Sequence, residues 1–223
     1  MRCVICFTAI VPEVSWGNVW KLPEKEWVCD HCSQKFERIN KKGCPLCSRN
    51  DSQGICFDCE RWEQHPVWQG VLSRNSSVFH YNDFAKEVVA RWKYRGDYQL
   101  ITAFEKELHQ VFADAKTKDL PLVPIPLSKE REVERGFNQA EAVIESVKGQ
   151  PYRLLERRHT EKQAKKDRKN RIHSENPFFL IESPPEVVVL VDDIYTTGTT
   201  LRHAASLLRK QGSRQVYSLT LFR

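Results

Sequence analysis

The sequence predicts an α/β protein whose mainly parallel sheet is flanked by helices and preceded by a small cysteine-rich module. Two observations predict this class. All eight cysteines lie within the first 59 residues. Beyond about residue 65, strand-like and helix-like segments alternate along the chain. Pro66 and Gly70 interrupt the chain between the two compositions. We therefore expect a module at residues 1–65 and a second domain at residues 66–223.

The elements of the second domain follow from hydrophobic spacing and turn residues. Apolar runs predict four strands, at Ser77–Tyr81, Leu120–Ile125, Val187–Val191 and Val216–Phe222. Helical spacing predicts helices after a cap at Asp83, at Leu100–Ala113, along the stripe from Phe137 to Val147, and at Thr199–Gln211. Residues 156–176 are polar and lack such a stripe, which predicts a mobile loop.

Two acids directly follow the most apolar strand. Val187–Val191 is five consecutive aliphatic residues, typical of a central parallel strand covered on both faces. Asp192 and Asp193 then stand where open α/β sheets bind their ligands, at the carboxyl end of a strand. Carboxylates repel phosphate but accept hydrogen bonds from vicinal sugar hydroxyls. The pair therefore predicts a ribose.

A glycine–threonine turn follows the acids and opens a helix. Gly198 allows a close backbone approach to a ligand, and the amides and hydroxyls around it converge on the positive end of the helix dipole. Capping alone would explain such a turn, but it leaves the preceding acid pair unexplained. We predict a binding loop for a phosphorylated ribose, formed by Asp192, Asp193, Thr196, Thr197, Gly198, Thr199 and Thr200.

The eight cysteines form four Cys-x-x-Cys pairs: Cys3/Cys6, Cys29/Cys32, Cys44/Cys47 and Cys56/Cys59. Each pair can place two thiolates on one metal ion, and two pairs complete a tetrahedral zinc site. We predict two structural Zn²⁺ ions, because a segment of about 60 residues buries little apolar surface by itself. We favour sequential pairing, in which the first two Cys-x-x-Cys pairs bind one ion and the last two bind the other, because the last two pairs form a compact ribbon. Interleaved pairing stays open. The tryptophans of the module (Trp16, Trp20, Trp27, Trp62) either form its small core or stack on bases.

The positive charge is concentrated in one segment. Residues 153–173 hold nine Lys or Arg against three Asp or Glu, which equals the net charge of +6 of the whole chain. Such a focus predicts a polyanionic partner, and single-stranded DNA fits through its phosphates. The alternative is a solvated charged loop. The candidate DNA-binding residues are Arg157, Arg158, Lys162, Lys165, Lys166, Arg168, Lys169 and Arg171.

No apolar stretch of about 20 residues exists, and the first residues are no signal peptide. Without an export signal we expect reduced thiols and a soluble cytoplasmic protein. Insertion into the membrane is not expected, and contact with its inner face would come through partner proteins.

Val188–Thr200 (VVLVDDIYTTGTT) resembles the signature of type I phosphoribosyltransferases, which bind phosphoribosyl pyrophosphate (PRPP). The resemblance implies a type I phosphoribosyltransferase-like sheet behind a double zinc-ribbon module. It also implies that Asp192 and Asp193 contact ribose hydroxyls, that Thr196 to Thr200 hold the 5′-phosphate, and that Mg²⁺ accompanies PRPP. The matching positions for a pyrophosphate loop are Pro126, Leu127, Ser128 and Lys129.

Three further stretches narrow the resemblance. Val123–Ala140, Lys93–Asp97 and the four cysteine pairs together resemble the ComF family of competence proteins, in particular its ComFC-like members. The resemblance implies a role in natural transformation, handling incoming single-stranded DNA. It also implies two protein partners, a helicase-like translocation motor and a recombination mediator.

Two functions follow. In the first, the zinc module and basic loop hold single-stranded DNA while the PRPP site takes PRPP or a nucleotide-like ligand. In the second, the chain is an active phosphoribosyltransferase that joins PRPP to a base or amine. The sequence stops at Arg223, directly after the last predicted strand, so we expect no C-terminal hood for a base. That expectation favours binding over catalysis, and the sequence identifies neither a catalytic residue nor an acceptor.

Overall fold

In the computed structural model a four-stranded, all-parallel sheet of order β1-β6-β5-β2 forms the centre of the fold. Its strands are β1 (Arg74–Phe79), β2 (Leu122–Pro124), β5 (Val187–Ile194) and β6 (Gln215–Phe222). The structure describes residues 1–11, 16, 20, 25–40, 42–113, 119–158 and 176–223. Most residues of β5 and β6 are buried, as expected for central parallel strands. The predicted fold class is confirmed.

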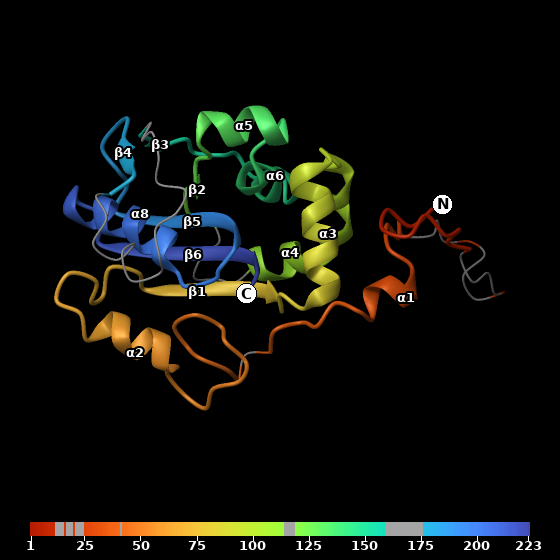
Figure 1. The fold of residues 1–223 in the computed structure, drawn as a ribbon, viewed down its shortest axis with the longest axis horizontal. Coiled ribbons are helices and arrows are strands. Elements are labelled where there is room, and N and C mark those ends of the chain that lie inside the picture. Colours follow the sequence, from red (N-terminus) through yellow and green to blue (C-terminus); the bar gives the residue numbers. More distant parts are fainter. Residues whose placement is uncertain (12–15, 17–19, 21–24, 41, 114–118, 159–175) are drawn as a thin grey trace.

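Helices cover both faces of this sheet (Figure 1). Side chains alternate across a strand, so Val189 and Val191 of β5 face one hydrophobic cluster while Val188 and Leu190 face another. The first cluster contains α3 (Asp83–Tyr94), the 3₁₀ helix η1 (Tyr98–Phe104), α4 (Glu105–Phe112) and α6 (Gln139–Ser146). The second contains α8 (Thr199–Lys210). The sheet thus has a separate core on each side.

Several predicted boundaries are wrong: β2 is shorter than predicted, and β5 runs on to Ile194, so it contains the two acids that are predicted to follow it. The cap of α3 is Asn82, whose side-chain oxygen accepts a hydrogen bond from the Ala85 amide at 2.9 Å, so Asp83 is the first helical residue. The helix predicted at Leu100–Ala113 is instead η1 followed by α4, and the tighter first part buries Leu100 and Phe104. Strand β1 begins at Arg74, earlier than predicted, because its polar residues find partners within the sheet. The Ser77 hydroxyl lies 2.7 Å from that of Thr220 on β6, which satisfies both.

Two short elements have no counterpart among the predicted ones. Helix α5 (Lys129–Arg135) follows β2, and β3 (Leu155–Arg157) pairs with β4 (Phe178–Leu180) as an antiparallel ribbon. Glu156 and Arg157 therefore belong to a strand and not to the predicted mobile loop, because they pair with Phe179 and Phe178. The rest of that predicted loop, residues 159–175, lies outside the described residues.

The cysteine-rich segment contains α1 (Asp30–Ser33) and α2 (Phe57–Glu63), which lie in different places: α1 beside α3, and α2 beneath the sheet (Figure 1). Cys3 and Cys32 join the hydrophobic cluster of α3, and Cys44, Cys47, Cys56 and Cys59 join that of α8. The domain division at residue 65 stays a prediction. None of the described helices is long and apolar enough to span a bilayer.

Candidate functional site

The two predicted acids are near the end of β5, at the carboxyl edge of the sheet. Asp193 is 8% exposed and forms an ion pair with Lys93 of α3. Its amide donates a hydrogen bond to the Asp192 carboxylate at 2.9 Å. Lys93 is not among the predicted site residues, although the segment Lys93–Asp97 contributes to the family resemblance. The two partners of this ion pair are far apart in the chain, and no local pattern reveals such a contact.

The pKa of Asp192 is raised above its ordinary value. Burial by the surrounding protein is the first cause and the neighbouring Asp193 carboxylate the second, while the Lys93 ammonium opposes both. A carboxyl group with a raised pKa is partly protonated near neutral pH, so it can donate a hydrogen bond as well as accept one. That suits recognition of a diol, whose hydroxyls are both donors and acceptors.

The predicted phosphate loop connects β5 to α8. Gly198 caps α8 in the left-handed region, with φ of 76°. The Thr197 and Thr199 hydroxyls lie 2.8 Å apart, and the Thr199 amide donates to the Thr197 hydroxyl at 3.4 Å. Thr196 and Thr200 are exposed. The loop therefore presents backbone amides and hydroxyls at the positive end of a three-turn helix, which is an arrangement that can bind an anion.

A cavity of about 450 Å³ opens beside the carboxyl end of β2. Because the Ile125 amide donates to the Val191 carbonyl at 2.9 Å, this end of β2 lies next to the acid pair of β5. Three of the four predicted pyrophosphate-loop residues line the cavity: Pro126, Leu127 and Lys129. Ser128 is not among its lining residues and instead caps α5, accepting a hydrogen bond from the Arg131 amide at 3.4 Å.

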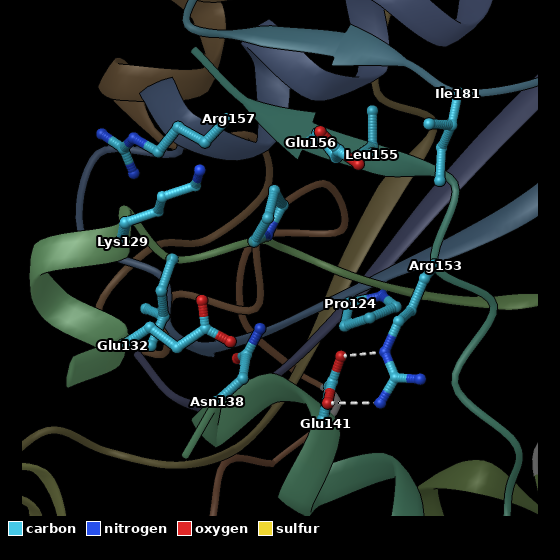
Figure 2. Close-up of a pocket in the computed structure, with 12 residues that line it drawn as sticks. Pro124, Lys129, Glu132, Asn138, Glu141, Arg153, Leu155, Glu156, Arg157 and Ile181 are labelled. Atoms are coloured by element: carbon cyan, nitrogen blue, oxygen red, sulfur yellow. Dashed lines mark hydrogen bonds and ion pairs between the residues drawn. The ribbon is translucent and has the colours of Figure 1, made fainter. Parts of the chain in front are cut away.

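Lys129 and Arg157 extend toward one another across the cavity from α5 and β3 (Figure 2). The pKa of Arg157 is lowered, first by burial and then by the nearby Arg131 cation, while Asp192 raises it. Arg157 therefore lies within electrostatic reach of Asp192. On another side of the cavity, Arg153 is neutralised by a bidentate pair with Glu141 at 2.7 and 2.9 Å. Glu132 and Glu156 also line the cavity, so its three positive and three negative side chains balance, and Lys129 and Arg157 lie together at one end.

Arg157 and Arg158 are the only predicted DNA-binding residues in the part of the chain that the structure describes. Arg158 is exposed, and its amide closes the ribbon by donating to the Pro177 carbonyl at 2.8 Å. The other six candidates (Lys162, Lys165, Lys166, Arg168, Lys169, Arg171) fall within residues 159–175, outside the described residues. The ribbon therefore places Arg157 in the lining of the cavity and ties Arg158 to the residue before β4.

Asn138 both caps a helix and lines the cavity. Its side-chain oxygen accepts from the Ala140 amide at 2.9 Å at the start of α6, and its side-chain nitrogen donates to the Ile125 carbonyl at 3.1 Å. One side chain thus ties the loop after β2 to α6.

The cysteines form two groups of four, with the sulfur atoms of each group within 4.8 Å of one another: Cys3, Cys6, Cys29, Cys32 and Cys44, Cys47, Cys56, Cys59. This is the sequential pairing that the spacing favours. A tetrahedral zinc site with Zn–S bonds of about 2.3 Å has sulfur–sulfur edges of about 3.8 Å. Cys6 and Cys29 lie 3.6 Å apart, and Cys47 and Cys56 3.5 Å apart. Both groups fit structural zinc, whose coordination would fix the chain around each knuckle.

The tryptophans of the module do not form one core. Trp62 is buried and packs edge-to-face on Trp68, with ring centroids 5.7 Å apart. Trp16 and Trp20 are 94% and 92% exposed, and Trp27 is half-buried beneath the Lys25 ammonium. The expectation of a small tryptophan core is therefore met only at Trp62.

Residues 136–223 match the family model described as a phosphoribosyl transferase domain. Nearly the whole chain is similar to competence proteins. It is 40% identical to competence protein ComFC of Bacillus subtilis (strain 168), over 99% of this chain and 94% of that protein. It is 32% identical to competence protein ComFC of Streptococcus pneumoniae, over 100% of both. DNA utilization protein YhgH of Escherichia coli (strain K12) is 26% identical over 92% of this chain and 95% of that protein.

Proposed function

Because the chain belongs to the ComFC family of competence proteins, we propose that it acts in natural transformation by handling incoming single-stranded DNA in the cytoplasm. In this proposal the zinc module and the basic segment hold the DNA. A ribose-phosphate site at the carboxyl edge of the sheet takes PRPP or a nucleotide-like ligand. The relatives named for competence and for DNA utilization support the biological setting.

The observation that carries the ribose-phosphate half is the proximity of two unlike anchors. Asp192 and Asp193 supply carboxyl groups for vicinal hydroxyls, and Thr196 to Thr200 supply amides and hydroxyls at the start of α8. The acids reject a phosphate at their own position, while the helix terminus attracts one. The two anchors together select a ligand that carries a diol at one end and a phosphate at the other.

The Lys129–Arg157 end of the cavity after β2 would take a second anionic group of the same ligand. Pro126, Leu127 and Lys129 line it, with Arg157 opposite. In PRPP this group is the pyrophosphate. Mg²⁺ would accompany it, because Mg²⁺ is commonly held by a carboxylate and substrate phosphates together.

The DNA-binding part of the proposal rests on the basic segment at residues 153–173, which includes β3 of the ribbon of β3 and β4. Of its candidate residues, Arg157 lines the same cavity and the adjacent Arg158 is exposed. A DNA strand bound along the ribbon would place a nucleotide near the acid pair. The ribose-phosphate site could then take a terminal phosphorylated nucleotide. The helicase-like motor and the recombination mediator expected as partners would deliver and receive that strand, and would bring the protein to the inner face of the membrane.

The ribose-phosphate proposal is tested by calorimetry with PRPP and Mg²⁺. Each charge-assisted hydrogen bond is worth about 1.5–3 kcal/mol, so Asp192→Asn/Asp193→Asn should weaken binding by about a hundredfold or more. The matched control is Asp83→Asn, whose side chain is 95% exposed at the start of α3. Unchanged affinity in the double variant would overturn the assignment of the site.

The DNA proposal is tested by oligonucleotide binding across a range of salt concentrations. Binding should weaken steeply with salt, and neutralising Lys165, Lys166, Arg168 and Lys169 should reduce that slope by about one unit per lost phosphate contact. The control is Arg209→Gln/Lys210→Gln, which also neutralises exposed basic residues but at the end of α8, outside the basic segment. Equal slopes in all three proteins would exclude the basic segment as the contact.

An active phosphoribosyltransferase is the second candidate, favoured by the position of the cavity at the carboxyl end of β2, the strand that pairs with β5. A carboxylate pair there would stabilise positive charge at the anomeric carbon while pyrophosphate leaves toward Lys129. A screen of bases and amines for pyrophosphate release from PRPP decides between the candidates. A single clean acceptor would make catalysis the primary function.

A further inference from the structure

The second cysteine group (Cys44, Cys47, Cys56, Cys59) contacts the predicted phosphate loop through two side chains. Arg223, the last residue after β6, donates from one guanidinium nitrogen to the Tyr195 and Thr196 carbonyls, at 3.2 and 2.9 Å. Its other terminal nitrogen donates to the Cys47 sulfur at 3.1 Å. One guanidinium therefore joins the metal ligands to the first residues of the loop.

Trp62 makes the second connection. Helix α2 is capped by Cys56 and carries Cys59 and Trp62 one turn apart, so the position of Trp62 follows from the cysteine knuckle. The Trp62 indole nitrogen donates to the Thr197 carbonyl at 3.0 Å. Three successive carbonyls of the loop, from Tyr195 to Thr197, thus accept hydrogen bonds from groups fixed by one cysteine group.

Trp62 and Arg223 also take part in the side-chain packing against the loop. The Arg202 guanidinium stacks on Trp62 at 4.8 Å and donates to the Tyr195 hydroxyl at 2.6 Å. The Arg223 guanidinium stacks on the other aromatic ring, Tyr195, at 4.6 Å. A Cβ atom on Gly198 would lie 2.2 Å from that hydroxyl. The loop therefore packs against a layer of two aromatic rings and two guanidinium groups.

The first cysteine group (Cys3, Cys6, Cys29, Cys32) contacts a different part of the fold, helix α3. Arg91 of α3 donates to the Ile5 and Val4 carbonyls, at 2.6 and 3.4 Å, and pairs with Asp97 at 2.8 Å. This group fastens the N-terminal knuckle to α3. The two groups, although alike in composition, hold different parts of the fold.

We propose that the metal site of the second cysteine group positions the ribose-phosphate loop, with Arg223 and Trp62 as the positioning residues, so that zinc binding and ribose-phosphate binding stabilise each other. The proposal rests on the ribose-phosphate site proposed above. Bound zinc would hold the four sulfurs in a tetrahedral arrangement. This would fix α2, which carries Cys59 and Trp62, and the Cys47 sulfur, which accepts a hydrogen bond from Arg223. Coupling of this kind is reciprocal: a ligand that needs the ordered loop binds tighter with zinc, and zinc is then held more tightly.

The first experiment measures hydrogen exchange of the Tyr195–Thr200 amides in zinc-saturated protein without ligand. Trp62→Phe keeps an aromatic ring, smaller than the indole, but loses the N–H donor, and Arg223→Gln loses the guanidinium. Both should speed exchange in the loop at least about tenfold, since the loop opens locally more often. The control Arg214→Gln, a 79% exposed residue paired with Glu186 at the start of β6, should leave it unchanged. Wild-type exchange in both Trp62→Phe and Arg223→Gln would overturn the inference.

The second experiment adds PRPP and Mg²⁺ to the same proteins. Affinity should fall about threefold to tenfold in Trp62→Phe and at least about tenfold in Arg223→Gln. In the wild type, PRPP should slow exchange in residues 44–62 and slow release of one of two zinc ions to a chelator. Arg223→Gln should lose both effects. Wild-type protein that does not bind PRPP refutes the proposed function, and the exchange experiment without ligand still decides the positioning role.

Discussion

At the scale of single residues, Gly198 combines a positive φ with a crowded site. Its φ of 76° disfavours any side chain, and a Cβ atom would lie 2.2 Å from the Tyr195 hydroxyl and 2.4 Å from an Arg202 nitrogen. Gly136 has nearly the same φ of 77° with nothing within 4 Å, so it isolates the backbone strain. Gly136→Ala should cost about 1–2 kcal/mol of stability. Gly198→Ala should lower the free energy of unfolding, measured in urea, by more than Gly136→Ala does. It should also weaken PRPP binding at least about tenfold. Equal effects of the two variants would contradict this prediction.

The ion pair between Lys93 and Asp193 is largely buried, with side chains 13% and 12% exposed. Lys93→Met leaves the Asp193 carboxylate without its cation, which should cost about 3–5 kcal/mol in the free energy of unfolding. The double variant Lys93→Met/Asp193→Asn removes both charges and should recover most of this loss. A double-mutant cycle from urea unfolding at saturating zinc measures the coupling, and additive single effects would show that the pair contributes nothing.

The raised pKa of Asp192 has a consequence for the pH dependence of stability. Burial and Asp193 disfavour the charged form in the folded state, so the stability contribution of Asp192 is full below its ordinary pKa and is lost as the pH rises through the raised pKa. The amide that replaces this carboxyl group in Asp192→Asn cannot ionise. The free energy of unfolding of Asp192→Asn minus that of wild type should therefore increase as the pH rises from about 5 to about 8. Asp83→Asn should show a flat difference, because the pKa of Asp83 is lowered by Lys86 and lies far below this range.

At the scale of elements, contiguous patterns predict well and distant contacts do not. The strand β5, its acids and the loop into α8 lie in consecutive residues, and the sequence predicts all of them in order. Helix α5 and the ribbon β3–β4 escape prediction because they are short and their partners lie elsewhere in the chain. Arg157 is an example: its pairing with Phe178 spans a segment whose own composition predicts only a loop.

Asn138 joins two elements, and the two roles can be separated. Asn138→Ala removes the cap of α6 and the bond to the Ile125 carbonyl, and should cost about 0.5–2 kcal/mol in thermal or urea unfolding. Asn138→Ser keeps a side-chain cap but is too short to reach Ile125. It should retain most of the stability while binding of pyrophosphate or PRPP weakens several-fold. Full affinity in Asn138→Ser would show that the loop after β2 holds its shape without this bond.

At the scale of the whole molecule, the sequence predicts two zinc groups but not where they attach. Spacing favours sequential pairing, because each knuckle is local. The attachments join residues far apart: Trp62 to Thr197, Arg223 to Cys47, and Arg91 to Ile5. Each depends on the completed tertiary fold. For the same reason the sequence leaves Trp62 as either a core residue or a base-stacking one, while its position against the phosphate loop is a property of the fold.

The two groups differ in exposure, which predicts an order of metal loss. All four cysteines of the second group are buried, while Cys6 of the first is exposed and Cys29 partly so. A chelator needs access to a sulfur, so zinc should leave the first group first. A metallochromic dye should report two phases of about one ion per chain each. Hydrogen exchange should rise around α3 in the fast phase and in Tyr195–Thr200 only in the slow phase. Cys6→Ser should remove the fast phase alone, whereas loss of both ions in one phase would mean that the two centres unfold as a single unit.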